Sequence, residues 1–117
     1  MTGGAALGLS AWRPVDIAGA PVADEAGLWI RFEQDGRVAG HGGCNAFSAR
    51  YTIDEVNLAI GPLAMTRKAG PPAIMAREVA FAAALAATRL FLRDGARLTF
   101  KDGRGVSLLR LVQIDCK

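Results

Sequence analysis

Residues 40–51 constrain this chain more than any other stretch, because three of their first four positions are glycine. Glycine costs backbone entropy, so a cluster of glycines marks places where no side chain fits or where φ must be positive. The apolar alternation that precedes the stretch stops there and restarts at Phe47. We therefore predict a bulged, tightly packed corner between two strands, in which Asn45 bonds nearby backbone atoms.

Length and composition limit the class of protein. A chain of 117 residues is expected to form one domain, and its 51% of hydrophobic residues is ordinary for a globular fold. The net charge of +3 is spread over interspersed arginines and acids without a long basic run, which disfavours nucleic-acid binding. No apolar stretch is long enough for a transmembrane helix. One histidine and two distant cysteines give no metal-ligand spacing, so we expect no metal and no cofactor.

Apolar residues alternate with period two over most of the chain, which predicts strands on both sides of a single helix. A flexible arm is expected at residues 1–11, before a domain that spans 12–117. The helix is predicted at 73–88, after two prolines in a row. Strands are predicted at 12–17, 28–33, 37–40, 47–53, 57–60, 63–67, 89–93, 97–101 and 106–114. This order favours a mainly β (α+β) fold, an antiparallel sheet or partly open β-barrel with one helix packed on it.

Glu78 is the most informative single residue, because it falls inside the apolar stripe that Ile74, Phe81 and Leu85 form on the predicted helix. A carboxylate in that position must be paired or rise in pKa. Arg67 ends the strand before the helix, and we predict a partly buried Arg67–Glu78 pair that ties the helix to the sheet. The first interpretation of this pair is architectural. The alternative is a charged pocket at the seam between helix and sheet.

His41 and Cys44 are the residues from which a nucleophilic catalytic unit would have to be built, since the chain has a single histidine. Their spacing does not by itself bring the side chains together, and no third orienting group is evident. The simpler interpretation is a half-exposed histidine beside a small buried thiol. A Cys44–Cys116 disulfide is a further alternative in an oxidising compartment.

The two tryptophans, Trp12 and Trp29, are expected in the core. The alternative is a place at the mouth of a barrel, because a buried indole still needs a hydrogen-bond partner. That alternative predicts a small-molecule-binding β-barrel with an apolar pocket.

Three ordered blocks resemble the META domain, the HslJ-like family. Residues 42–51 match its signature G-G-C-N-x-F-x-x-x-Y, residues 60–67 match I-G-P-L-A-x-T-R, and residues 75–78 match its M-x-x-E helix. The resemblance runs from Trp12 to about Leu111. Its structural signature residues in this chain are Gly42, Gly43, Cys44, Asn45, Phe47, Tyr51, Gly61, Pro62, Thr66, Arg67 and Glu78.

One position departs from the family pattern. Members commonly read T-R-M-A-C-P after the third group of strands, whereas Gly70 stands here in place of the cysteine. A family disulfide or thiol site built on that position is absent. Cys44 therefore either pairs with Cys116 or stays reduced.

The resemblance implies a cracked barrel interrupted by a helix, similar to that of secretin pilotins. It implies a bacterial cell-envelope setting, often as a lipoprotein or secreted domain, and a link to heat shock and stress. It supplies no catalytic residues, so we expect a non-enzymatic, monomeric domain. A groove beside the helix would bind an envelope protein or a lipid-like partner, with Trp12, Trp29, Arg67 and Glu78 as candidate binding residues.

The sequence leaves alternatives open for both the cellular location and the function. The family implies a periplasmic or secreted protein, but the first twelve residues carry no basic residue and make a poor secretory signal. A cytoplasmic location therefore stays open. Besides the small-molecule-binding barrel, a weaker alternative is a thiol-dependent enzyme that uses Cys44 and His41.

Overall fold

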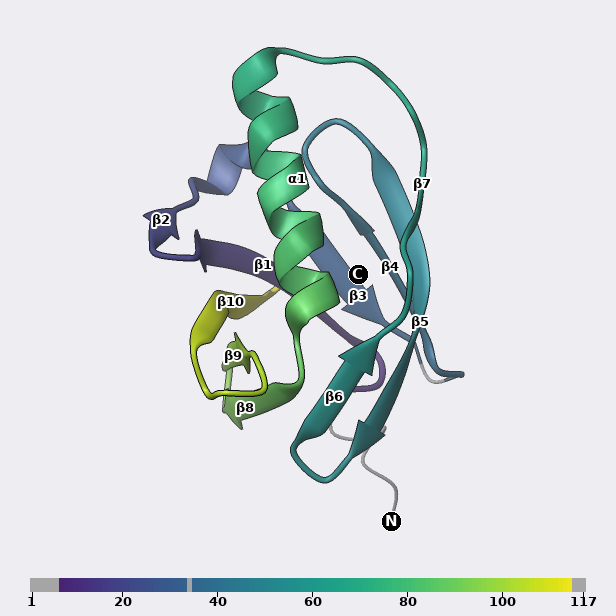
Figure 1. Ribbon diagram of the computed structural model, residues 1–117, viewed down its shortest axis with the longest axis vertical. Helices are drawn as coiled ribbons and strands as arrows, with labels where there is room; N and C mark the ends of the chain where they lie inside the picture. The colour runs from purple at the N-terminus through teal and green to yellow at the C-terminus, as the bar shows by residue number, and fades with distance from the viewer. Residues whose placement is uncertain (1–6, 34, 115–117) are drawn as a thin grey trace.

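The computed structural model describes residues 7–33 and 35–114, which form ten strands and one α-helix (Figure 1). Before the helix α1 (Pro72–Ala87) come β1 (Ser10–Ile17), β2 (Ala20–Pro21), β3 (Trp29–Phe32), β4 (Arg37–His41), β5 (Ala46–Asp54), β6 (Asn57–Ile60) and β7 (Ala64–Met65). After it come β8 (Leu90–Asp94), β9 (Arg97–Lys101) and β10 (Ser107–Ile114). The helix agrees with the predicted segment to within one residue at each end.

Eight strands form a closed antiparallel barrel in the order β1-β3-β4-β5-β6-β8-β9-β10, and β10 pairs with β1 to complete the ring. The narrowest junction joins β6 to β8 through one register pair, Asn57↔Leu90, and the flanking backbone bonds. Outside the ring, β2 pairs with β1 and β7 pairs with β5. The predicted fold class, a mainly β (α+β) antiparallel barrel with one helix packed on it, is confirmed, but the ring is closed where a partly open barrel was predicted.

The inward side chains of the strands fill the barrel, and α1 lies across its front (Figure 1). The helix contributes Phe81 and Leu85 to this core. Phe81 meets Phe47 of β5 edge to face, with ring centroids 5.8 Å apart. Such aromatic pairs stabilise a fold beyond the area they bury. The contact therefore helps to hold α1 against β5.

The predicted flexible arm is wrong for residues 7–11, which belong to the domain. Leu7 is fully buried in the core, and β1 already begins at Ser10. The Ser10 hydroxyl donates to the Leu7 carbonyl and accepts the indole N–H of Trp12 at 2.8 Å. Burial of Leu7 and these two bonds hold residues 7–11 to the domain, whereas residues 1–6 lie outside the described residues.

The glycine stretch is a hairpin turn rather than the predicted bulged corner. β4 and β5 pair without a register shift up to His41↔Ala46, and residues 42–45 make the connection. The Gly42 N–H donates to the Asn45 carbonyl at 2.9 Å, and Gly43 has a φ of +108°. A tight turn with positive φ uses glycine for the same physical reason as a bulge, which is why the sequence did not separate the two.

Candidate functional site

The buried carboxylate of Glu78 on α1 binds the hairpin turn at residues 42–45. One carboxylate oxygen accepts the backbone N–H groups of Cys44 and Asn45 at 3.0 and 2.5 Å, and the other accepts the Asn45 side-chain amide at 2.7 Å. Glu78 is only 4% exposed. Three donors on one carboxylate make this the strongest polar link between the helix and the barrel.

Asn45 extends this link to a third element, the segment that follows β7. Its side-chain oxygen accepts the Thr66 hydroxyl at 2.8 Å and the Lys68 backbone N–H at 2.6 Å. Its side-chain nitrogen also donates to the Lys68 carbonyl at 3.1 Å. The prediction that Asn45 bonds nearby backbone is thus wrong about the partner, because the bonded backbone lies on a segment distant in sequence. We call Cys44, Asn45, Thr66, Lys68 and Glu78 the polar cluster.

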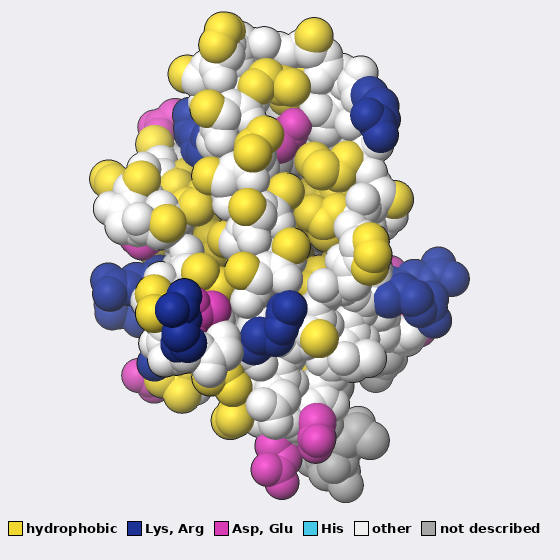
Figure 2. Space-filling view, in the orientation of Figure 1, with side chains coloured by type: hydrophobic (Ala, Val, Ile, Leu, Met, Phe, Trp, Pro, Cys, Tyr) yellow, Lys and Arg dark blue, Asp and Glu magenta, His cyan; other side chains and the backbone are white. Residues whose placement is uncertain are grey.

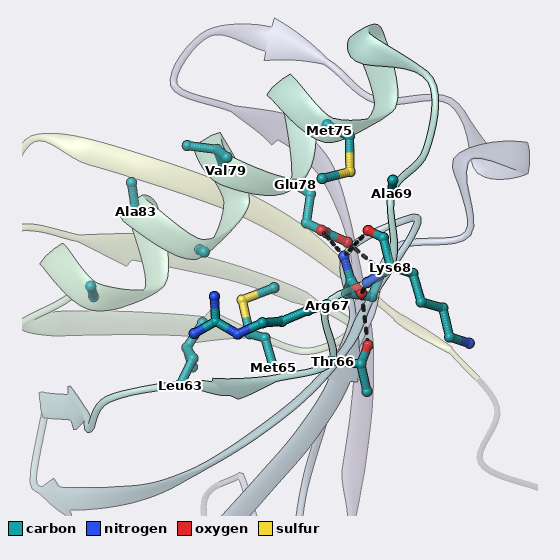
Figure 3. Close-up of a pocket in the computed structure, with 13 residues that line it drawn as sticks. Leu63, Met65, Thr66, Arg67, Lys68, Ala69, Met75, Glu78, Val79 and Ala83 are labelled. Atoms are coloured by element: carbon teal, nitrogen blue, oxygen red, sulfur yellow. Dashed lines mark hydrogen bonds between the residues drawn. The ribbon is translucent and has the colours of Figure 1, made fainter.

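The predicted Arg67–Glu78 pair is wrong. Within the described part of the chain Arg67 makes no ion pair, and its side chain extends along Leu63 and Met65 (Figure 3). The carboxylate is already satisfied by N–H donors from the turn, so it does not need the guanidinium. Arg67 instead lies exposed at the side of the helix.

The surroundings of Glu78 shift its pKa in two opposite directions. Burial raises the pKa of this carboxyl, while hydrogen bonds from the Asn45 side chain and from the Asn45 and Cys44 backbones lower it. The nearby charge of His41 lowers it further. The net result is a pKa below the ordinary value for glutamate, so Glu78 is an anion at neutral pH.

The glycines of the turn make room for this carboxylate. A Cβ on Gly42 would lie 2.5 Å from Cγ of Glu78. A Cβ on Gly40 would overlap both the Trp29 carbonyl oxygen and the Phe47 ring. Gly40 and Gly42 are therefore required by close approach, and Gly43 by its positive φ.

The structure does not unite His41 and Cys44. Nδ1 of His41 accepts the Gly43 N–H at 3.1 Å, and the Cys44 thiol donates to the Lys68 carbonyl at 3.5 Å. No hydrogen bond joins the two side chains among the described residues. Cys44 carries a free thiol there, and Cys116 lies outside the described residues, as does the predicted disulfide.

A groove opens between α1 and residues 63–69, beside the polar cluster (Figure 3). It has a volume of about 790 Å³. Its walls and floor are mainly apolar, with charged groups at one end. The residues that line it are Asn45, Leu63, Met65, Thr66, Arg67, Lys68, Ala69, Met75, Glu78, Val79, Ala82, Ala83 and Ala86.

The solvent side of α1 continues this apolar surface. Its exposed residues are Pro72, Ala73, Ala76, Val79, Ala80, Ala83, Ala86 and Ala87. None of these side chains is polar, and Val79 is 66% exposed. Figure 2 shows hydrophobic side chains gathered along the helix and in the hollow beside it.

Neither tryptophan lies in this groove. Trp12 is fully buried and packs under the Arg93 guanidinium, 4.9 Å from the ring centroid. Trp29 is half-buried, with Arg31 at 5.5 Å from its ring centroid. Of the four predicted binding residues, Arg67 and Glu78 line the groove and the two tryptophans do not.

The sequence analysis missed the apolar lining of the groove, above all Met65, Val79 and Ala83. A usable signal was present, because Arg77 and Glu78 are the only charged residues of the helix, and Glu78 faces inward. A surface helix normally carries polar residues on its outer face. On α1 the outer face is almost entirely apolar, with Arg77 as its charged residue.

The other expectations about chemistry were tested on the described ranges. Residues 7–33 and 35–114 hold no group of three histidine, cysteine or acidic side chains arranged to bind a metal ion. Nor does that part of the chain contain a helix with the length and hydropathy needed to span a membrane.

A family model gives the family of this chain, and solved structures share its fold. The model of the META domain matches residues 5–114. An NMR structure of a protein from Burkholderia xenovorans is 19% identical, covers 97% of this chain and 87% of its own, and superposes with a TM-score of 0.74. A crystal structure of a DUF4847 family protein from Bacteroides vulgatus is 14% identical, covers 95% of this chain and 96% of its own, with a TM-score of 0.70. At these identities the likeness concerns the fold alone. Among curated proteins no relative matches the chain.

Proposed function

The chain belongs to the META domain family, and on that premise we propose that it is a non-enzymatic binding domain of the bacterial cell envelope. Its groove between α1 and residues 63–69 holds an apolar partner, either a protein segment or a lipid-like ligand. The observation that carries this proposal is the mainly apolar lining of the groove, which α1 and the segment 63–69 form together.

Exposed apolar surface of this kind is costly unless something covers it. Scattered exposed hydrophobic residues are ordinary, but a continuous patch marks a binding site or an aggregation hazard. Here the patch lines a concave space of about 790 Å³, within the usual range for ligand pockets. Its floor of Leu63 and Met65 and its wall of Val79 and Ala83 suit an apolar occupant.

Two features support a binding role over catalysis. The carboxylate that enters the groove, Glu78, is saturated by three donors and held as an anion, which leaves it a poor general acid or base near neutral pH. His41 and Cys44 bond to separate backbone groups, so neither activates the other.

The envelope setting, the stress-response link and the monomeric state rest on the family resemblance. The envelope setting is tested by fractionating cells that make the protein natively, with cytoplasmic and periplasmic marker proteins as references. Recovery with the periplasmic or membrane marker supports the envelope setting. Recovery with the cytoplasmic marker alone contradicts it and leaves the groove proposal to be judged separately.

The groove proposal is tested with N-phenyl-1-naphthylamine, a neutral apolar dye that fluoresces when it leaves water. We expect the wild-type protein to bind the dye and Ala83→Arg to lose about tenfold or more in affinity, because Ala83 lines the groove. Ala80→Arg is the matched control, since Ala80 is exposed on the same helix outside the groove lining. Equal binding by all three proteins would reject the groove as the binding site.

A further inference from the structure

Residues 64–68 form a strand edge that is paired on one side only. The Thr66 N–H donates to the Ala46 carbonyl at 3.0 Å, next to the β7–β5 pairs. Where β7 ends, the side-chain amide of Asn45 takes over and binds both the N–H and the carbonyl of Lys68. Asn45 thus acts in place of a strand backbone and keeps the segment extended up to Lys68.

The pairing pattern fixes where the remaining backbone groups point. In an antiparallel pair, successive residues direct their N–H and C=O groups to opposite edges. Thr66 and Lys68 point toward β5 and the turn, so Met65 and Arg67 point away from them. Within residues 7–33 and 35–114, no loop or helix group bonds to the backbone of Met65 or Arg67. This free edge borders the groove, with α1 on the far side (Figure 3).

Unpaired backbone groups beside an apolar groove select a polypeptide over an acyl chain. A strand edge is a template for another strand about 4.8 Å away, and an acyl chain has no donors or acceptors to offer it. In strand addition, main-chain bonds supply affinity and alternate side chains supply specificity. The groove lies on the side of β7 where every second side chain of an added strand would point.

The charges at the end of the groove indicate one further property of the occupant. Glu78 is the acidic residue in the lining; its hydrogen bonds leave it an anion, and its single charge is outnumbered by those of Arg67 and Lys68. Arg67 and Lys68 are exposed cations in the same lining, and neither has an ion-pair partner among the described residues. The uncompensated charge of the groove is therefore positive, which favours an acidic side chain in the bound segment.

We propose that an extended segment of a partner protein adds to the free edge at Met65 and Arg67 as an extra strand of the sheet. Apolar side chains at every second position of the segment lie against Val79 and Ala83, and an acidic side chain lies at Arg67. This inference rests on the proposed function, because it names the class of partner that occupies the same groove.

The test uses a labelled eight-residue peptide that alternates valine with threonine and carries one central aspartate. Fluorescence polarisation measures its binding to the wild-type protein. Two variants of the peptide are N-methylated at every second residue, one in each register, so the side chains stay the same. We expect one register to lower affinity about tenfold or more and the other to leave it unchanged, because only one edge of the added strand bonds to β7. Equal affinity of both methylated peptides would overturn strand addition.

Variants of the protein locate the contact. Met65→Pro removes an N–H that points to the free edge and leaves the hydrogen bonds to β5 intact. An edge strand tolerates proline at such a position. The substitution should abolish peptide binding while the circular dichroism spectrum stays that of the wild type. Arg67→Glu should weaken binding of the peptide that carries aspartate. It should strengthen binding of a peptide that carries lysine instead of the aspartate. If Arg67→Glu binds both peptides equally, the acidic contact is refuted.

The outcomes also separate this inference from the proposed function. Binding of N-phenyl-1-naphthylamine without binding of any peptide would leave the groove standing and overturn the protein-strand occupant. Displacement of the dye by dodecanoate, with no displacement by the peptide, would assign the groove to a lipid-like ligand and reject strand addition. Failure of both dye and peptide to bind would reject the groove itself.

Discussion

Two parts of α1 face the same segment, residues 63–69, in opposite ways. Glu78 reaches the segment through the polar cluster, where Glu78 and Asn45 are both nearly inaccessible to solvent and fully hydrogen-bonded. The part of the helix from Val79 onward faces the segment across an open groove, with small apolar side chains such as Val79 and Ala83. One end of the groove is thus locked by buried polar bonds, and the rest is left for an occupant.

This difference assigns the two regions separate tasks. Buried polar groups that are fully satisfied specify a single arrangement, because any other arrangement leaves a donor or acceptor unpaired. An exposed apolar wall does not stabilise the fold in the same way. It lowers the free energy only when a partner covers it and removes it from water. Changes in the polar cluster should therefore act on stability, and changes in the groove should act on binding.

The largest effect is expected from Glu78→Ala, which leaves three donors of the turn without their acceptor. We expect the free energy of unfolding to fall by about 3–5 kcal/mol, the range typical when one partner of a buried charged network is removed. Urea unfolding followed by circular dichroism measures the change. Arg77→Ala is the matched control on the same helix, and its effect should stay within about 0.5 kcal/mol. Similar effects of the two substitutions would show that the polar cluster is not what holds α1.

The second effect is a gain. A Cβ at position 70 would lie 2.9 Å from Sγ and 3.5 Å from Cβ of Cys44, a separation of Cβ atoms that suits a disulfide. In the Gly70→Cys variant, the introduced thiol should therefore form a disulfide with Cys44 on oxidation. The oxidised variant should be more stable than its reduced form by about 3 kcal/mol.

Mass spectrometry of the alkylated protein counts the free thiols, and thermal unfolding with and without reductant measures the gain. Gly70→Ser is the control, because it adds a side chain of similar size that cannot form the bond. A fully alkylated Cys44 in the oxidised variant would contradict the geometry of the cluster.

A smaller effect on the free energy of unfolding is expected when the pH is lowered. The folded state lowers the pKa of Glu78, so the unfolded chain binds this proton more readily than the folded one. Its stabilising contribution is complete above the ordinary glutamate pKa and is lost as pH falls through the lowered value. As pH falls below the ordinary glutamate pKa, we expect the stability of the wild type to drop more steeply than that of Glu78→Gln. Parallel pH profiles would mean that Glu78 does not carry the dependence.

The smallest effect on stability is expected at the groove. Val79→Lys replaces an exposed residue with a better helix former, so unfolding should change by no more than about 0.5 kcal/mol. Binding of N-phenyl-1-naphthylamine should nevertheless fall about tenfold, because a charge then stands in the apolar wall. A large loss of stability would show that the groove wall belongs to the core and would remove the contrast between the groove wall and the polar cluster.

Much of the fold could be predicted from local patterns. The alternation around residues 28–33 and 97–101 marked strands, and the alanine-rich stretch after Pro71 and Pro72 marked the helix. The resemblance to the META domain rested on blocks that the family match confirms. Residues 7–11 were wrongly assigned to the arm because small residues hid the burial of Leu7, which depends on tertiary packing.

The candidate site was predicted in part. The helical period alone showed that Glu78 faces the core and needs a partner, and the structure bears this out. It could not show that the partner is a turn rather than Arg67, because both lie many residues away and the choice depends on how α1 docks. The groove was expected beside the helix, but its lining by Met65, Val79 and Ala83 was not.

The sequence by itself determined the period of each element, the glycine-rich turn and the inward position of Glu78, because these depend on residues a few positions apart. Only the tertiary structure decided that Asn45 and Cys44 bind Glu78, that β10 closes on β1, and that the far edge of β7 has no strand beside it in the described part of the chain. The physical reason is that a hydrogen-bond partner or an open edge is set by which distant segments meet. A chain of strands carries many such pairings in its local pattern, and packing of the core selects one of them.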